Sequence, residues 1–250
     1  PFIGGSYVHD ISGRTGAPRT TWGTMRKWGG QTGATFVLGK STIAAFTFDA
    51  IFERGYLAKP YRFVPLFDAG VTVPAGASID DVNNARRPDR PIDAVPDARD
   101  RFAAAFRVAH RFEAATLRFD QRLYRDSWGA LASTSDARYT VDVGSRVRIW
   151  PHLRFHGQQA VAFWERTYTA SVAPDGTVGF PTYRTGDREL GPLYTATMGF
   201  GLRWRMSASA HAPWVLFVQG DGIFTRYLNA LYITERRGVF FATGVEVEIE

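Results

Sequence analysis

The most constraining feature of the chain is the stretch YTATMGFGLRWRM at positions 194–206, in which apolar and polar side chains alternate without a break. Successive side chains of a β-strand point to opposite faces, so the pattern predicts a strand with one apolar and one polar face. Soluble strands usually have about 5–6 residues, whereas a membrane-crossing strand needs about 9–11 at a tilt near 45°. The pattern favours a strand whose apolar face contacts lipid, and a long strand of a soluble sandwich is the alternative.

Nine further segments alternate in the same way, the last three less regularly because glycines interrupt them: 41–54, 101–110, 114–126, 136–144, 152–167, 239–249, 2–9, 30–39 and 213–228. Gln121 breaks the apolar face of its segment. The connections alternate between short and longer ones, with a short one at 145–151, a medium one at 126–134 and long ones at 55–100 and 169–189. Outer-membrane barrels have short periplasmic turns and longer extracellular loops.

These patterns predict an all-β chain, with residues 1–250 forming a single domain. The expected architecture is a transmembrane antiparallel up-and-down β-barrel of about ten strands, with more strands if the full protein is longer. A soluble sandwich or a lipocalin-like barrel is the alternative. The sequence starts with Pro1 and has no intact signal peptide, so we expect that a leader was removed or that the chain begins within a longer protein.

Composition narrows the class of protein further. The mean hydropathy is -0.19 and no run of about 18 apolar residues occurs, which excludes a transmembrane helix but not barrel strands, because every second barrel residue faces the lumen. The chain has no cysteine, so it has neither disulfides nor thiolate metal sites. The net charge is +6, but the arginines are scattered singly, which argues against a nucleic-acid partner.

The long connection 55–100 is rich in proline and charged residues, and we expect it to be extracellular. Its part 80–98 should be the most mobile, because charged residues and prolines cannot form a core. The stretch GYLAKPYRFVPLF at 55–67 carries apolar and aromatic side chains that could pack on the rim or fold into the lumen.

Strand polarity predicts which side chains face the lumen and which anchor the barrel in the membrane. The lumen-facing charged residues are expected to be Arg107, Arg118, Asp120, Arg122, Arg138, Asp142, Arg154, His156, Arg203, Arg205, Glu246 and Glu248. Tyr124, Trp128, Tyr194 and Trp204 are expected in the aromatic girdles. For Tyr124 and Trp128, binding of a partner or ligand at the outer rim is the alternative.

No combination of residues indicates an enzyme, a cofactor or a metal site. His152 and His156 would lie about 13 Å apart along a strand, too far to share an ion. Asp126, Ser127 and His152 could form a triad only if the fold brought them together. The segments GFG and GGQTG do not precede a helix, so they are not phosphate loops.

Four stretches resemble a bacterial outer-membrane β-barrel family known only as a domain of unknown function. They are GYLAKPYRFVPLF (55–67), LRFDQRLYRDSWG (117–129), LRFHGQQAVAFW (153–164) and YRTGDRELG (183–191), in that order, and the resemblance covers roughly residues 30–250. It implies a barrel fold and an outer-membrane location but no established activity. The chain departs from the family at Gln121, where an aromatic residue is common, and at its end, VEVEIE, which lacks a terminal aromatic residue.

Two functions remain open at this point. The first is a channel for small solutes, including anions, because the expected lumen carries more arginines than carboxylates. The second is a closed barrel that acts as a structural scaffold for periplasmic or surface proteins. The partners are expected to be the bilayer of the outer membrane and other envelope proteins. Lumen filling distinguishes the two functions, since an eight-stranded barrel is filled by side chains and a barrel of 16–18 strands holds water.

Overall fold

The chain forms a ten-stranded antiparallel sheet, in a computed structural model that describes residues 1–14, 20–206 and 214–247. Each strand pairs with the next one in the sheet, in a simple up-and-down order. All ten strand predictions are confirmed, and so is the all-β class. The strands are β1 (Phe2–Arg14), β2 (Thr20–Val37), β3 (Thr42–Gly55), β5 (Ala98–Arg111), β6 (Ala115–Asp126), β7 (Leu131–Val143), β8 (Val147–Gln158), β12 (Leu193–Arg205), β13 (Trp214–Tyr227) and β14 (Glu235–Val247).

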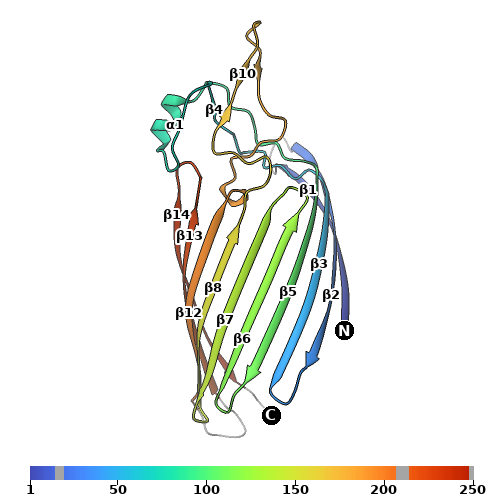
Figure 1. Cartoon of the computed structure of the whole chain (residues 1–250), viewed down its shortest axis with the longest axis vertical. Helices are drawn as coiled ribbons and strands as arrows, with labels where there is room; N and C mark the ends of the chain where they lie inside the picture. Colours follow the sequence, from blue (N-terminus) through green and yellow to red (C-terminus); the bar gives the residue numbers. More distant parts are fainter. Residues whose placement is uncertain (15–19, 207–213, 248–250) are drawn as a thin grey trace.

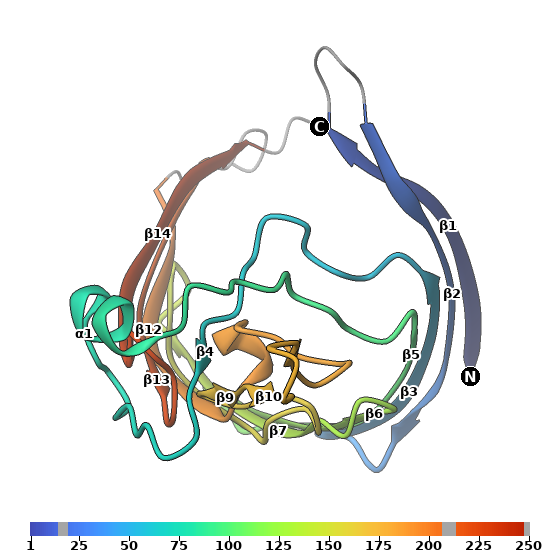
Figure 2. The ribbon, with the colours of Figure 1, turned by 90° about the horizontal axis from the view of Figure 1, so that it is seen from above.

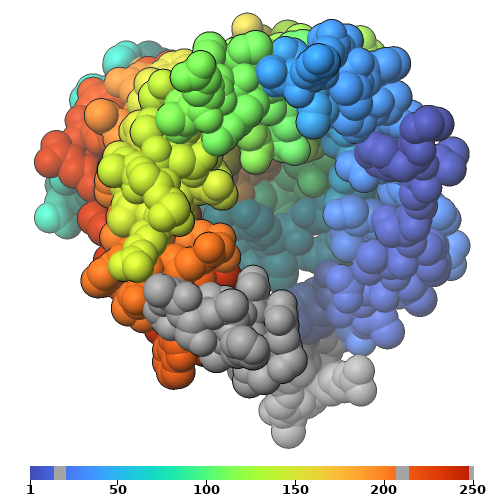
Figure 3. Space-filling view, turned by 90° about the horizontal axis from the view of Figure 1, so that it is seen from below, coloured from blue at the N-terminus to red at the C-terminus, as the bar shows by residue number. Residues whose placement is uncertain are grey.

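The sheet curls strongly, so that β1 and β14 lie on opposite sides of a gap (Figure 2). Among the described residues, β1 pairs only with β2, and β14 pairs only with β13. Seen from the opposite end, the strands surround a central hollow (Figure 3). The curl therefore gives the sheet a concave inner face and a convex outer face.

The connections divide between the two ends of the sheet (Figure 1). The turns 38–41, 112–114 and 144–146 lie at one end, here called the turn end. The connections 56–97, 127–130, 159–192 and 228–234 lie at the other end, here called the loop end. The predicted alternation of short and long connections is confirmed for these segments, and the turn expected at 207–213 lies outside the described residues.

Several strand boundaries differ from the prediction: β1 continues to Arg14 rather than residue 9, and β2 begins at Thr20 rather than residue 30. β7 begins at Leu131 rather than at residue 136, and β8 spans Val147–Gln158 rather than 152–167. Pro151 suggested a turn, yet it lies inside β8. The ladder between β7 and β8 is interrupted at Tyr139 and Thr140, opposite this proline, whereas the pairing with β12 continues. A proline is tolerated there because its missing N–H falls at the gap in the ladder.

The loop end carries a cap built from small elements. These are β4 (Leu66–Phe67), α1 (Ile79–Ala85), β9 (Tyr168–Thr169), β10 (Ser171–Val172), β11 (Val178–Gly179) and the 3-10 helix η1 (Arg188–Leu190). β4 pairs in parallel with β9, which joins the two long connections. None of the helices in the described residues is long and apolar enough to cross a membrane.

The expectation that residues 80–98 form no core is wrong. Val82 of α1 is fully buried against Phe67, Val73 and Ala77. The helix begins with a capping box, in which the Ser78 side chain accepts a hydrogen bond from the backbone N–H of Asp81 and the Asp81 carboxylate accepts one from Ser78. The sparse apolar residues of this segment suffice for a core because they pack against the preceding part of the same connection.

Candidate functional site

The polar residues predicted to face a lumen lie together on the inner face. Residues that pair across strands point to the same face, and the register relates Arg107 to Asp120, Arg118 to Arg138 and Arg138 to His152. The same face carries Arg107, Arg118, Asp120, Arg122, Arg138, Asp142, Arg154, His156, Arg203, Arg205 and Glu246. Glu248 lies outside the described residues. Trp150 and Val215 on this face are buried, as expected for the concave side of a curled sheet.

Ion pairs connect neighbouring strands along this face. Asp120 of β6 accepts hydrogen bonds from Arg107 of β5 and from Arg118 Nε, the latter at 2.6 Å. Asp142 of β7 contacts Arg148 Nε at 2.6 Å and Arg111 Nη2 at 2.7 Å. Each carboxylate therefore serves two arginines, which leaves the face with an excess of positive charge.

Other ion pairs reach over an intervening strand. Arg122 of β6 lies 3.2 Å from Asp49 of β3, across β5. Arg203 of β12 lies 2.9 Å from Glu246 of β14, across β13. Contacts of this kind are favoured where the sheet curves inward, because side chains on the concave side converge.

His152 bridges two carboxylates from different strands. Its Nε2 lies 2.9 Å from Asp136 Oδ2 on β7, and its Nδ1 lies 3.5 Å from Asp221 Oδ1 on β13. Gly199 of β12 lies between His152 and Asp221, and a Cβ built there would fall 1.7 Å from the Asp221 carboxylate. The glycine is therefore required for the two side chains to meet over β12.

A second glycine of β12 makes room for an aromatic pair. A Cβ on Gly201 would lie 2.0 Å from the Trp150 ring, which crosses the strand and stacks on Phe217 with a centroid distance of 5.9 Å. Both glycines fall on the polar face of the alternating stretch 194–206, but the stretch does not indicate which side chains cover them. The glycines at alternate positions, in GFG, are the only signal that could have suggested a close approach.

Two cavities lie on the inner face. One of about 500 Å³ at the turn end is lined by Arg148, Arg203 and Arg205 together with Asp142. The other, of about 350 Å³ near the loop end, is lined by Arg122, Arg154 and His156 among others. Among the described residues, Arg138 and Arg154 have no carboxylate within 4 Å. The inner face thus combines empty space with unpaired positive charge.

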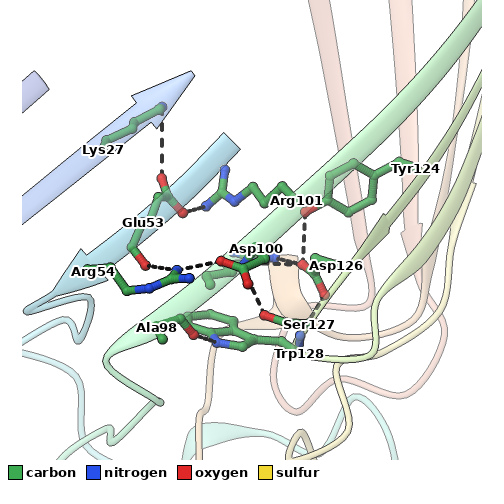
Figure 4. Close-up of polar contacts among 11 residues, drawn as sticks. Lys27, Glu53, Arg54, Ala98, Asp100, Arg101, Tyr124, Asp126, Ser127 and Trp128 are labelled. Atoms are coloured by element: carbon green, nitrogen blue, oxygen red, sulfur yellow. Dashed lines mark hydrogen bonds and ion pairs between the residues drawn. The ribbon is translucent and has the colours of Figure 1, made fainter. Parts of the chain in front are cut away.

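At the loop end, a buried carboxylate fastens the connection between β6 and β7 (Figure 4). The side chain of Asp126 is inaccessible and accepts hydrogen bonds from Arg99 Nε at 2.8 Å and from the Tyr124 hydroxyl at 2.8 Å. It also accepts the backbone N–H groups of Trp128 and Ala130, at 3.0 and 2.9 Å. One carboxylate therefore closes the turn and ties it to β5.

Two girdle predictions need correction. Trp128 is only 6% exposed, packs against Val161 and donates its Nε1–H to the Ala98 carbonyl at 2.8 Å. The Arg99 guanidinium lies 4.2 Å from the centroid of its ring. Tyr124 lies on the inner face, since it alternates with Leu123 on the outer face. Both residues stabilise the connection between β6 and β7. Tyr194 and Trp204 lie on the outer face, and their position at a membrane boundary stays a prediction.

A second charged group beside Asp126 links β2, β3 and β5 (Figure 4). Glu53 is buried, and its carboxylate lies 2.8 Å from Arg101 Nη2 and 3.8 Å from Lys27 Nζ. On the outer face of the same strands, Arg54 pairs with Asp100. These pairs fix the loop-end edges of the three strands from both sides.

A buried carboxylate of the connection 159–192 links the two halves of the cap. Asp187 contacts Arg62 Nη1 at 2.6 Å and also pairs with Lys59. Burial works to raise the pKa of Asp187, but the hydrogen bonds from Arg62 and Lys59 outweigh it and hold the pKa below its ordinary value. The connections 56–97 and 159–192 are therefore fastened to each other by an ion pair as well as by β4 and β9.

A neighbouring carboxylate in the cap is perturbed in the opposite direction. Burial raises the pKa of Asp93 above its ordinary value, and nearby Asp187 adds to the rise, although Thr185 and Arg62 oppose it. The resemblance stretches 55–67 and 183–191 contain the cap residues Lys59, Arg62 and Asp187, but sequence reasoning gave none of them a role.

The candidate catalytic and metal-binding residues are not brought together. Ser127 Oγ accepts a hydrogen bond from the backbone N–H of Asp100, Asp126 binds Arg99, and His152 lies on β8 between other partners. His156 contacts Thr134 Oγ1 at 2.8 Å. Within the described ranges, no three His, Cys, Asp or Glu side chains are grouped so that they could hold a metal ion.

Comparison with known proteins gives one family. Residues 14–215 match the model of a family described as a protein of unknown function, DUF3570. No curated protein matches the chain. The match starts earlier and ends earlier than the resemblance at roughly residues 30–250, but it includes all four stretches that carry it. Because the match covers well over half of the chain, the chain belongs to the DUF3570 family of proteins of unknown function.

Proposed function

We propose that the chain is an outer-membrane β-barrel that acts as a passive pore for small solutes, with a weak preference for anions. The observation that carries this proposal is the division of the sheet between an exposed apolar outer face and a charged inner face. A membrane barrel requires this division, because its outer face contacts lipid and its inner face contacts water.

Large apolar side chains lie exposed on the outer face of β3, β5, β6, β7, β8, β12, β13 and β14. Soluble monomers rarely expose contiguous apolar patches larger than a few hundred Å². The exposed outer-face residues include Phe46, Phe48, Phe52, Phe106, Leu117, Phe119, Leu123, Leu131, Tyr139, Leu153, Phe155, Met198, Phe200, Trp204, Trp214, Val239, Phe241 and Val245. A lipid environment accounts for this surface.

A row of charged residues bounds the apolar band at the loop end. Arg54 pairs with Asp100, and Arg226 pairs with Glu235. On β12 the apolar band runs from Tyr194 to Trp204, a rise of about 33 Å along the strand at about 3.3 Å per residue. At a barrel tilt of about 40° this corresponds to about 25 Å, which is the usual height of the lipid-facing band.

Polar side chains inside the band satisfy one another. Gln121 interrupts the outer face of β6, but its Nε2 donates to Ser133 Oγ at 2.8 Å and its Oε1 accepts from Ser135 Oγ at 2.6 Å. In hydrocarbon no water replaces a missing hydrogen bond, so polar groups there need protein partners. The residue that weakened the apolar pattern in the sequence is thus compatible with lipid contact.

The inner face supports transport rather than a filled interior. Two cavities, of about 500 and about 350 Å³, remain among the side chains. Arg138 and Arg154, which have no carboxylate within 4 Å in the described part of the chain, add positive charge. Rings of basic side chains favour anions in pores. The two long connections cross the loop end in Figure 2, so the cap would narrow the entrance and restrict passage to small solutes.

A closed scaffold barrel is the second candidate, favoured by the same cap and by the ion pairs that link the inner face. Planar-bilayer recordings on the full-length protein distinguish the two. The pore predicts a measurable conductance with weak anion selectivity. Insertion into the bilayer without conductance would favour the scaffold, and a cation preference would contradict the assigned inner face.

A further inference from the structure

An apolar groove of about 710 Å³ crosses the outer face near the loop end. The register places its central residues in one row across five neighbouring strands, so that each is the cross-strand partner of the next. The row consists of Ala104, Leu123, Ser133, Gly157 and Tyr194. Because Ser133 and Gly157 are small and the flanking Leu123 and Tyr194 are large, the row forms a depression rather than a smooth wall.

The bottom of the groove is not filled by the protein. A Cβ on Gly157 would meet its nearest described neighbour, a ring carbon of Phe155, only at 3.8 Å, an ordinary contact distance. Gly199 and Gly201 are different, since a side chain at either position would collide with a neighbour. The space above Gly157 is therefore open toward the outside.

Among the residues that the structure describes as lining the groove, one carries a positive charge. Arg125 follows Leu123 on the outer face of β6, one position closer to the loop end, between its cross-strand partners Phe102 and Leu131. Among the described residues no carboxylate lies within 4 Å of Arg125, whereas Arg54 and Arg226 at the same end are paired. An apolar groove with an unpaired cation at its polar edge is complementary to an acylated molecule that carries an anionic group.

We propose that this groove binds the phosphorylated, multiply acylated glycolipid of the outer leaflet, with acyl chains in the groove and a phosphate on Arg125. The inference rests on the proposed function and on the expectation that the long connection 55–100, which lies at the loop end, is extracellular. The two walls of the groove, Leu123 and Tyr194, stand three strand spacings apart, about 14 Å at about 4.8 Å each, which is wider than one chain requires. The groove thus fits a lipid with several chains.

The test measures lipid retained by the full-length protein. Vesicles of phosphatidylcholine are doped with lipid A, with phosphatidylglycerol in a second arm, and native mass spectrometry counts the bound molecules after detergent extraction. Gly157→Leu fills the groove, and Gly220→Leu is the matched control. Gly220 also lies on the outer face, away from the groove, and its Cβ would be 3.9 Å from its neighbours. Arg125→Gln removes the cation, with Arg237→Gln as its control.

We expect lipid A to be retained over both phospholipids. Gly157→Leu should weaken lipid A retention about tenfold because the acyl-chain contacts are lost, and Arg125→Gln about tenfold because a charge-assisted hydrogen bond is lost. The two control variants should retain lipid A as well as the unmodified protein does. Equal retention of all three lipids, preferential retention of phosphatidylglycerol, or equal losses in Gly220→Leu and Gly157→Leu would overturn the inference. The proposed function fails separately, if the unmodified protein does not insert into vesicles at all.

Discussion

A comparison of Phe200→Arg with Val143→Arg tests whether the outer face contacts lipid, because the two residues lie at different positions along their strands. Phe200 lies in the middle of β12, and Val143 is the last residue of β7 at the turn end. Both lie on the outer face, and each is 52% exposed. Accessibility alone therefore gives the two positions the same expected tolerance, and only a membrane distinguishes them.

The expected costs follow from depth in the bilayer. An arginine at the midplane of a barrel wall costs about 2–4 kcal/mol, and one near an interface costs about 0–1 kcal/mol. Phe200→Arg should therefore lower the free energy of unfolding by about 2–4 kcal/mol and Val143→Arg by no more than about 1 kcal/mol. In water, exposed surface substitutions are usually within about 0.5 kcal/mol of neutral at both sites.

The assay is reversible denaturant unfolding of the protein in lipid vesicles, followed by tryptophan fluorescence. Phe200→Ala and Val143→Ala are measured alongside, so that the loss of apolar contact is separated from the added charge. Equal and small effects of arginine at the two positions would refute lipid contact. A larger cost at Val143 than at Phe200 would show that the membrane band is placed at the wrong height.

Three further predictions concern the buried carboxylates and the topology. Asp126→Asn should destabilise the protein by about 3–5 kcal/mol, because it leaves the largely buried Arg99 without its counter-charge. Glu113→Gln, in an exposed turn, should be near neutral in the same unfolding assay. Folding lowers the pKa of Asp187, so the stabilisation of the cap by Asp187 is present above about pH 4 and is lost as the pH falls further. Folding raises the pKa of Asp93, so the contribution of Asp93 to stability increases as the pH falls. Hydrogen exchange at the backbone amides of Arg62 and Thr185 should report this opening. Asp187→Asn should remove the loss of stability below about pH 4, while the opposite contribution of Asp93 remains. Protease added to intact cells should cut the exposed tip between β10 and β11, which projects from the cap in Figure 1, and cleavage only after the outer membrane is opened would invert the topology.

Local alternation was sufficient to predict the ten main strands, because the two faces of each strand carry different side chains. The outer face is mostly apolar and the inner face is mostly polar. The same pattern grouped the arginines and acids of the main strands on one face, which the register identifies as the concave face of the sheet for the described residues; a lumen there stays a prediction. The pattern gave a wrong result where apolar and polar residues alternate outside a strand. Residues 159–167 continue to alternate after β8, but the chain turns there, and Val161 packs against Trp128.

The contacts that organise the loop end could not be predicted from the sequence. Lys59 and Asp187 are far apart in the chain, and nothing in either local stretch indicates the other. The same holds for His152 and Asp221, which meet only because Gly199 of the intervening strand has no side chain. The error at Trp128 has a similar origin. An aromatic residue near a strand end fits a girdle, and only the position of Val161 and Arg99 shows that it is buried.

The most direct test of the central claim is a nitroxide scan along β12. The chain has no cysteine, so single cysteines can be introduced and labelled one at a time. Labels at Ala196, Met198 and Leu202 should be accessible to oxygen dissolved in lipid, and labels at Thr197 and Arg203 to a water-soluble relaxation agent, in vesicles that contain the protein. A period of two in these accessibilities is the predicted result. Access of the water-soluble agent to both sets of positions alike would contradict the account.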